Sequence, residues 1–209
     1  MLKRASLAII FVSVALLFLF ISIFRTARPR YSFKLAPTPA PQTASEININ
    51  YNLPATGYIG PESPFWALEV MRDKLWLAVT RNPIKKAEIL LLLSDKRLSS
   101  AVELAEKGKY NEATSVVIKS EMYLIQSLDQ LEKASGEGYE VLGFAGHLSL
   151  ASLKHREILE EFLTQAPEDA KPIIIKTLDN AKLVYESIMH LSQEHGRTLP
   201  PNPFEENQN

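Results

Sequence analysis

Residues 141–162 read VLGFAGHLSLASLKHREILEEF and carry the clearest helical pattern of the chain. Its apolar and small residues recur at steps of three and four, the spacing that places side chains on one face of an α-helix. The stripe consists of Val141, Ala145, Leu148, Ser152, His155, Leu159 and Phe162. It predicts an amphipathic helix that packs against other helices, with His155 on the packed face.

On both sides of this segment, helix-boundary residues and periodicity predict four more helices. Asn82 and Pro83 form a capping pair, while Gly108, Gly136 and Gly138 occur where helices should end. The predicted helices cover residues 64–80, 83–107, 109–135, 139–165 and 167–195. No strand signal follows residue 60, and short connections favour antiparallel neighbours. We expect an all-α fold: an antiparallel bundle of about five helices, built from a leading helix and two helical hairpins.

Three of these segments indicate where the core lies. Residues 89–93 are apolar on all sides, so the second helix is expected at the centre of the bundle. The third helix has the stripe Tyr110, Ala113, Val117, Ser120, Leu124, Ser127 and Leu131. The fifth has Ile174, Leu178, Ala181, Tyr185 and Ile188. Pro167, Glu168 and Asp169 are expected in its first turn.

The N-terminal 28 residues form a predicted membrane anchor region. Residues 5–24 carry no charge and would make roughly 30 Å of helix, the thickness of a bilayer's hydrocarbon core. A cleaved signal peptide is the alternative, but its apolar region is usually shorter, at about 7–15 residues. The chain after this segment, Arg-Thr-Ala-Arg-Pro-Arg at 25–30, is a poor cleavage context. A transmembrane helix over 5–24 is therefore expected, whereas the basic residues on its two sides leave its orientation open.

Proline marks the boundaries of the folded part. Seven of the 13 prolines lie between residues 29 and 64, so residues 29–50 are expected to form an extended stalk. Residues 51–64 suggest a loop that packs on the domain. The predicted helical domain covers residues 51–196, and residues 197–209 are expected to be a disordered tail.

Composition excludes several classes of function. The chain has no cysteine, which removes thiolate catalysis, cysteine-ligated zinc and iron–sulfur clusters. Its net charge of −1 conceals a division: residues 1–30 hold five basic residues and no acid, whereas residues 31–209 hold 18 basic and 24 acidic residues. The acidic second part, without a stripe of basic and aromatic residues, argues against nucleic acid as a partner.

The four histidines offer the candidates for chemistry. Glu186, His190 and Glu194 recur at steps of four and could align three metal ligands on one helical face, although this spacing is also common on solvated helix surfaces. His155 is expected to be a histidine at the edge of the core, hydrogen-bonded to a neighbour, with a buried pH or ligand sensor as the alternative. No set of residues meets the geometric roles of catalysis. We expect no enzyme activity, no catalytic residues and no cofactor.

Three minor features leave alternatives open. Trp66, Trp76 and Phe65 are expected in the core or at the bundle edge, with a role at the membrane interface as the alternative. Gly143 and Gly146 lie inside a helix, where they permit close packing, mark a kink or open a pocket. Residues 112–120 match residues 169–177 at an offset of 57, which indicates either stacked hairpins or chance.

Ordered blocks of sequence resemble the bacterial "domain of unknown function 5667" family over about residues 51–190. The blocks are Tyr51-Asn52-Leu53-Pro54-x-x-Gly57, Pro61-Glu62-Ser63-Pro64-Phe65, Met71-Arg72-Asp73-Lys74-Leu75, Asn82-Pro83-x-Lys85-Lys86-Ala87-Glu88, Ser94-Asp95-Lys96-Arg97-Leu98, Lys107-Gly108-Lys109-Tyr110, Lys154-His155 with Ile158-Leu159, and Pro167-Glu168-x-Ala170. Thr56 stands where we expect proline. The resemblance implies a bacterial envelope protein with an all-helical domain outside the cytoplasm, and no catalytic residue comes with it.

These observations predict a single-pass membrane-anchored protein whose helical domain binds or scaffolds a protein partner. The lipid bilayer is the expected partner of residues 5–24. Two alternatives remain: a cytoplasm-facing, tetratricopeptide-like adaptor, and a sensor bundle that responds to metal or pH through His155 or through Glu186, His190 and Glu194.

Overall fold

A computed structural model describes residues 12–14, 18, 48–55, 63, 66–199 and 202–206. The predicted transmembrane helix over 5–24 lies outside these residues except for 12–14 and 18, and most of the predicted stalk lies outside them too. Across the described part of the chain, none of the helices combines the length and the hydrophobicity that crossing a bilayer requires.

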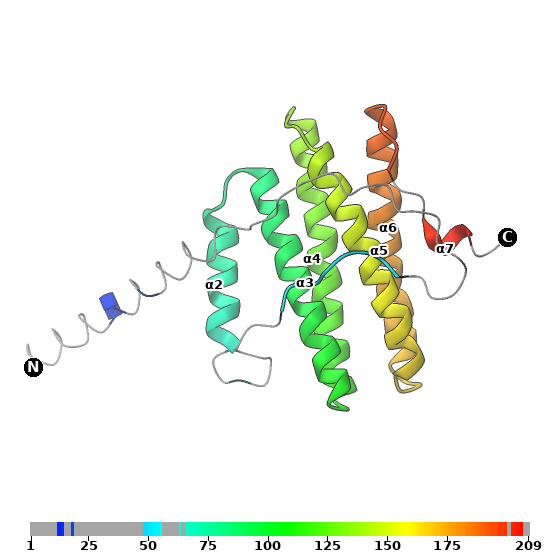
Figure 1. Cartoon of the computed structure of the whole chain (residues 1–209). Coiled ribbons are helices and arrows are strands. Elements are labelled where there is room, and N and C mark those ends of the chain that lie inside the picture. Colours follow the sequence, from blue (N-terminus) through cyan, green and yellow to red (C-terminus); the bar gives the residue numbers. More distant parts are fainter. Residues whose placement is uncertain are drawn as a thin grey trace, which may run out of the picture.

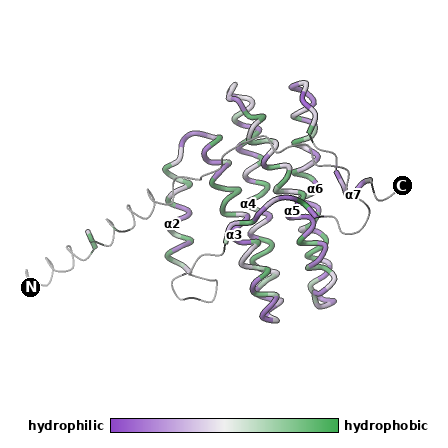
Figure 2. The backbone as a smooth tube through the Cα atoms, viewed as in Figure 1, coloured by the Kyte–Doolittle hydropathy of each residue, from purple (hydrophilic) through white to green (hydrophobic). Residues whose placement is uncertain are grey.

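The described residues fold into helices, and no strand occurs among them, so the prediction of an all-α fold is confirmed. The helices are α2 (Trp66–Val79), α3 (Pro83–Glu106), α4 (Tyr110–Gly136), α5 (Leu142–Gln165), α6 (Lys171–Glu194) and the short α7 (Pro203–Glu206). Hydrophobic and hydrophilic residues alternate in bands along the helices (Figure 2), as expected for helices with one packed face.

Local chemistry explains the start of α3 and the ends of α3 and α4. The Asn82 side chain accepts a hydrogen bond from the Lys85 amide at 3.0 Å, which caps α3 as predicted. Gly108 and Gly138 follow α3 and α4 with φ angles of 75° and 81°, a region in which glycine is favoured.

The predicted start of the last long helix is wrong by four residues. Residues 168–170 form a turn in which the Pro167 carbonyl accepts hydrogen bonds from the amides of Ala170 and Lys171. The helix begins at Lys171, and Pro172 occupies its first turn. A proline does occupy the first turn of this helix, but it is Pro172 and not Pro167, the earlier of the two.

The predicted stripes form the core. Val141 and the six stripe residues within α5 are buried, as are all five of α6 and the predicted stripe residues of α4 except the half-buried Tyr110. In α3, Ile89, Leu90, Leu91 and Leu93 are between 0% and 4% exposed and Leu92 is half-buried. The helix packs against α2, α4 and α5, in agreement with the predicted central position.

The long helices pair as two hairpins, α3 with α4 and α5 with α6, and the hairpins pack together mainly through α4 and α6 (Figure 1). The opposite side, between α3 and α5, is less tightly closed by the helices themselves. Residues 48–55, cyan in Figure 1, run across this side over α3 and α5. We call residues 48–55 the strap.

The packed structure extends beyond both predicted boundaries. Ile49 is buried, so the domain starts before residue 51 and the predicted stalk is too long. Phe204 is also buried, and the Arg156 guanidinium lies 4.1 Å from the centre of its ring. The prediction of a disordered tail is therefore wrong for residues 202–206, because one aromatic side chain is enough to hold this segment on the core.

Gly143 and Gly146 make no close approach to another backbone. A methyl group at Gly146 would lie 3.7 Å from a Leu199 side-chain atom, and one at Gly143 would lie 3.8 Å from the Glu140 carboxylate. Both are ordinary van der Waals distances, so close packing does not explain these glycines.

Candidate functional site

The strap occupies the open side of the bundle as an extended segment without helical structure. The Ile49 amide donates a hydrogen bond of 2.8 Å to Glu157 Oε2 on α5, and the Ser99 hydroxyl on α3 donates one of 2.9 Å to the Pro54 carbonyl. The side chains of Ile49 and Tyr51 pack into the core. The space between α3 and α5 is thus able to hold a polypeptide through both its backbone and its side chains.

A buried polar cluster lies beneath the strap. The Tyr51 hydroxyl donates a hydrogen bond of 2.6 Å to Asp95 Oδ2. His155 lies between two carboxylates, with Nε2 at 3.1 Å from Asp95 Oδ1 and Nδ1 at 2.6 Å from Glu121 Oε1. His155, Asp95 and Glu121 are at most 1% exposed. Helices α3, α4 and α5 and the strap each contribute one residue to this cluster.

The two carboxylates hold His155 in its charged form. Burial alone lowers the histidine pKa, but the Glu121 charge and the hydrogen bonds to Asp95 and Glu121 outweigh burial and raise the pKa to about 9. Both ring nitrogens of His155 therefore donate at neutral pH. The cluster combines one buried cation with two carboxylates, a fixed electrostatic contact among three helices.

The structure places His155 at the centre of the core, not at its edge as predicted, although the predicted hydrogen bond to a neighbour is confirmed. The sequence did not predict its partners Asp95 and Glu121, or Tyr51, which donates to Asp95. A signal for two of them was present, because Asp95 and Glu121 occur at buried positions of otherwise apolar helix faces. A carboxylate at a buried position on an apolar helix face requires a hydrogen-bonding or charged partner in the core.

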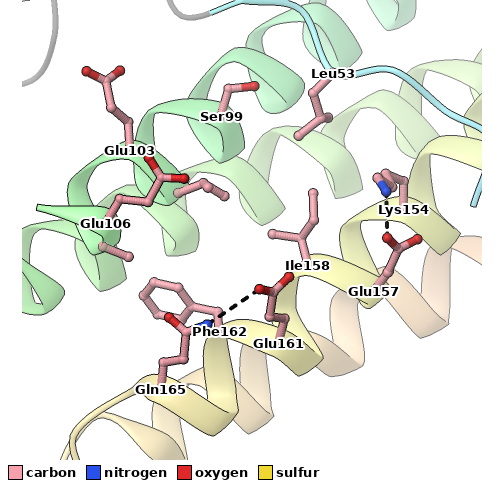
Figure 3. Close-up of a pocket in the computed structure, with 12 residues that line it drawn as sticks. Leu53, Ser99, Glu103, Glu106, Lys154, Glu157, Ile158, Glu161, Phe162 and Gln165 are labelled. Carbon is pink, nitrogen blue, oxygen red and sulfur yellow. Dashed lines mark hydrogen bonds and ion pairs between the residues drawn. The ribbon is translucent and has the colours of Figure 1, made fainter. Parts of the chain in front are cut away.

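Beyond Leu53 of the strap, the space between α3 and α5 continues as an open pocket of about 500 Å³ (Figure 3). Apolar atoms of Leu53, Val102, Ile158 and Phe162 line it. Its other lining residues are Ser99, Glu103, Ala105, Glu106, Lys154, Glu157, Glu161 and Gln165. We call this pocket the α3–α5 groove.

Four carboxylates make the α3–α5 groove acidic. Glu103 and Glu106 come from α3, and Glu157 and Glu161 from α5. Lys154 is the one basic residue that lines the groove, and its ammonium group contacts Glu157 (Figure 3). Glu103 also pairs with Lys107 outside the groove at 2.7 Å, so Glu106 and Glu161 supply the excess negative charge. An apolar floor with this excess suits an occupant that has both apolar and basic groups.

The residues proposed as metal ligands lie elsewhere, on the exposed face of α6. His190 Nδ1 is 3.4 Å from Glu194 Oε1, and Glu186, His190 and Glu194 are all exposed. Within the described residues, no group of three or more histidine, aspartate or glutamate side chains is arranged to hold a metal ion. The structure brings His190 and Glu194 together as a surface pair.

The fold and the groove define a class: a small helical bundle with an extended segment bound across its open side. Residues 58–169 match the model of the family described as "Domain of unknown function (DUF5667)", and the chain belongs to this family. The matched region contains Asp95, Glu121, His155 and the whole lining of the α3–α5 groove except Leu53. No curated protein and no solved structure matches the chain.

Proposed function

We propose that this protein is a non-catalytic binding module that holds an extended segment of a partner protein in the α3–α5 groove. One observation carries the proposal: the strap already lies in the first part of the same space, held by Glu157 and Ser99. A partner segment would continue along the path that the chain's own strap begins.

The lining of the groove supports a partner segment with lysine or arginine side chains. Leu53, Ile158 and Phe162 offer apolar contact, and Glu106 and Glu161 are exposed carboxylates at the rim. Complementary charge of this kind steers association and sets specificity. The same excess of negative charge would repel the phosphates of a nucleic acid, in line with the prediction that nucleic acid is not a partner.

Binding without catalysis is part of the proposal. His155, whose pKa is raised to about 9, is fully buried. Both of its ring nitrogens are hydrogen-bonded, one to Asp95 and one to Glu121. A catalytic acid or base must instead reach the proton of a substrate. The buried cluster therefore suits a structural contact between helices.

The setting of the module is proposed from the sequence. An anchor over residues 5–24 would hold the domain at a membrane, with the domain outside the cytoplasm of a bacterial cell, as the family resemblance implies. Protease treatment of intact cells tests this orientation: the domain should be digested, whereas protection of residues 51–209 would place it inside. A cytoplasm-facing adaptor would use the same groove.

Binding is tested with random peptides selected against the full chain in nanodiscs. We expect the enriched peptides to carry lysine or arginine among apolar residues. Val102→Trp places an indole in the groove and should weaken their binding by about tenfold or more, because the cavity is then filled. Ser115→Trp, at an exposed site on α4 outside the groove, is the matched control and should bind as the wild type does.

Two results would contradict the proposal. Selected peptides that bind equally well to the Val102→Trp variant use another surface. Enrichment of acidic peptides would remove the argument from charge.

A further inference from the structure

The outward surface of α2 is almost entirely apolar. Among the described helices α2 packs against α3 alone, and none of the others covers its opposite side. Leu68 and Met71 are each 52% exposed, Leu75 is 38% and Val79 is 61%. Ala67 and Ala78 are exposed on the same side, and Lys74 is the one charged residue among them. We call these seven residues the outer face of α2.

The tryptophans that suggested a membrane role in the sequence do not belong to this face. Trp76 is 5% exposed and packs with Ile89 and Leu93 of α3. Trp66 is half-buried, and the Arg97 guanidinium lies 5.5 Å from its ring centre. The aromatic side of α2 thus attaches the helix to the bundle, and the aliphatic side remains outside.

The charges around the outer face are segregated by sign. Between residues 66 and 94, all of which are described, the exposed charged residues are Lys74, Arg81 and Lys85, and no acidic residue is exposed. This is unusual in a chain whose residues 31–209 hold 24 acids and 18 bases.

The acids of this region are held away from solvent by paired bases. Asp73 is 2% exposed and contacts Arg72 at 2.8 Å and the buried Arg97 at 3.5 Å. Glu69 pairs with Arg72 at 3.2 Å, and Glu88 pairs with Lys85 at 2.8 Å. The exposed surface is therefore apolar with basic charges only.

We propose that the outer face of α2 docks on an anionic lipid surface. A helix with an aliphatic face and basic flanking charges is suited to the boundary between headgroups and acyl chains. The size of the face also favours lipid over a second copy of the chain. A helix of 14 residues is about 21 Å long, too short to bury the roughly 800 Å² per partner of a standard protein interface. The proposal is independent of partner binding in the α3–α5 groove.

Two exposed methionines give a matched test, because the chain has no cysteine of its own. Met71 on α2 is 52% exposed and Met122 on α4 is 53% exposed. The full-length chain is prepared as Met71→Cys or Met122→Cys, labelled with a polarity-sensitive dye, and reconstituted in vesicles with brominated acyl chains. We expect the bromine atoms to quench the dye at position 71 and to leave the dye at position 122 unaffected when anionic lipid is present.

Charge and apolar contact are then tested separately. Lys74→Gln should lower the ratio of docked to undocked α2 about fivefold, since one basic residue near an anionic surface is lost. Leu68→Gln with Leu75→Gln should abolish quenching at position 71. Both changes are on the exposed face, and an unchanged circular dichroism spectrum and melting temperature would show that the fold is intact.

Three outcomes would overturn the proposal. Equal quenching at positions 71 and 122 shows that α2 does not face the lipid. Equal quenching at position 71 in zwitterionic and anionic vesicles shows that charge plays no part. The dye at position 71 could instead quench itself to a degree that rises with the ratio of protein to lipid, with no effect of bromine. This result would indicate that a second copy of the chain covers the outer face of α2.

Discussion

At the scale of single residues, the buried cluster around His155 is the feature with the greatest energetic consequence. Three ionisable groups are taken out of water, and each is tolerated only because the others compensate it. Removing one partner leaves a buried charge without compensation, which costs far more than the pair contributes.

His155→Ala should therefore destabilise the protein by roughly 3–5 kcal/mol, because Asp95 and Glu121 are left facing each other in the core. Urea unfolding followed by circular dichroism measures the change. His190→Ala is the control: this residue is exposed, so its replacement should alter stability by less than about 0.5 kcal/mol. Similar losses in the two variants would show that the buried cluster is not special.

The same residue predicts how stability depends on pH. The pKa of His155 is raised from 6.5 to about 9 in the folded protein, so the stability it contributes is fully present below pH 6.5. That contribution is lost as the pH rises through about 9. The free energy of unfolding should fall over this window.

With four histidines, NMR titration can follow His155 directly. A midpoint for its ring protons near 9 is expected, whereas a midpoint at or below 6.5 would contradict the proposed charge state.

The sequence predicted that His155 lies on a packed helix face, but not its depth in the core or its surroundings. Periodicity predicts which residues lie on the buried face of a helix, and this prediction is confirmed for every residue of the stripe that contains His155. The partners are 60 and 34 residues away in the chain, and their approach depends on how three helices are aligned along their axes. Local spacing contains no information on that alignment.

At the scale of elements, the glycines divide by backbone conformation. Gly146→Ala should stabilise the protein by about 1 kcal/mol, since alanine is the better helix former and its methyl group would meet Leu199 at an ordinary distance. Gly138→Ala should destabilise it by about 1 kcal/mol, because the φ of 81° is strained for a residue with a Cβ atom. Thermal unfolding of the two variants should give shifts of opposite sign, and shifts of the same sign would contradict this assignment.

Of the three hydrogen bonds that hold the strap, the one from Tyr51 to Asp95 is fully buried. Tyr51→Phe keeps the ring but removes the bond to Asp95, which should cost about 1.5–3 kcal/mol because the acceptor is charged. Hydrogen exchange should show faster exchange of the Ile49 amide, since its segment is held less firmly. Tyr139→Phe changes a tyrosine that is 43% exposed and should leave both measurements unaltered. An unchanged Tyr51→Phe variant would show that apolar contact and the hydrogen bonds to Glu157 and Ser99 hold the strap without the Tyr51 hydroxyl.

Helix boundaries were predicted well where a single residue type decides them, as at Asn82 and Gly108. They were predicted poorly where two signals compete, as at Pro167 and Pro172. The strap and residues 202–206 were missed in part for a different reason. Irregular segments have no periodicity, so the burial of Ile49 and Phe204 becomes visible only once the bundle surface exists.

At the scale of the whole molecule, the chain separates its charges by region as well as by sequence. The α3–α5 groove collects carboxylates, while the exposed charges around α2 are basic. The overall charge of −1 predicts neither surface. Tertiary packing fixes the rotation of each helix about its own axis. This rotation decides which charged side chains face outward, and the overall charge contains no information on it.

The position of the strap has a mechanical consequence. Residue 48 is the first residue of the strap, so tension applied to the chain on its N-terminal side would enter the described domain at the strap. Ile49 and Tyr51 are the first packed residues to resist it, before any of the helices α2 to α6 is stretched. Peeling them away would take the hydroxyl of Tyr51 from Asp95 and uncover the part of the space between α3 and α5 that these residues occupy. The arrangement makes exposure of that space sensitive to force while the hairpins remain folded.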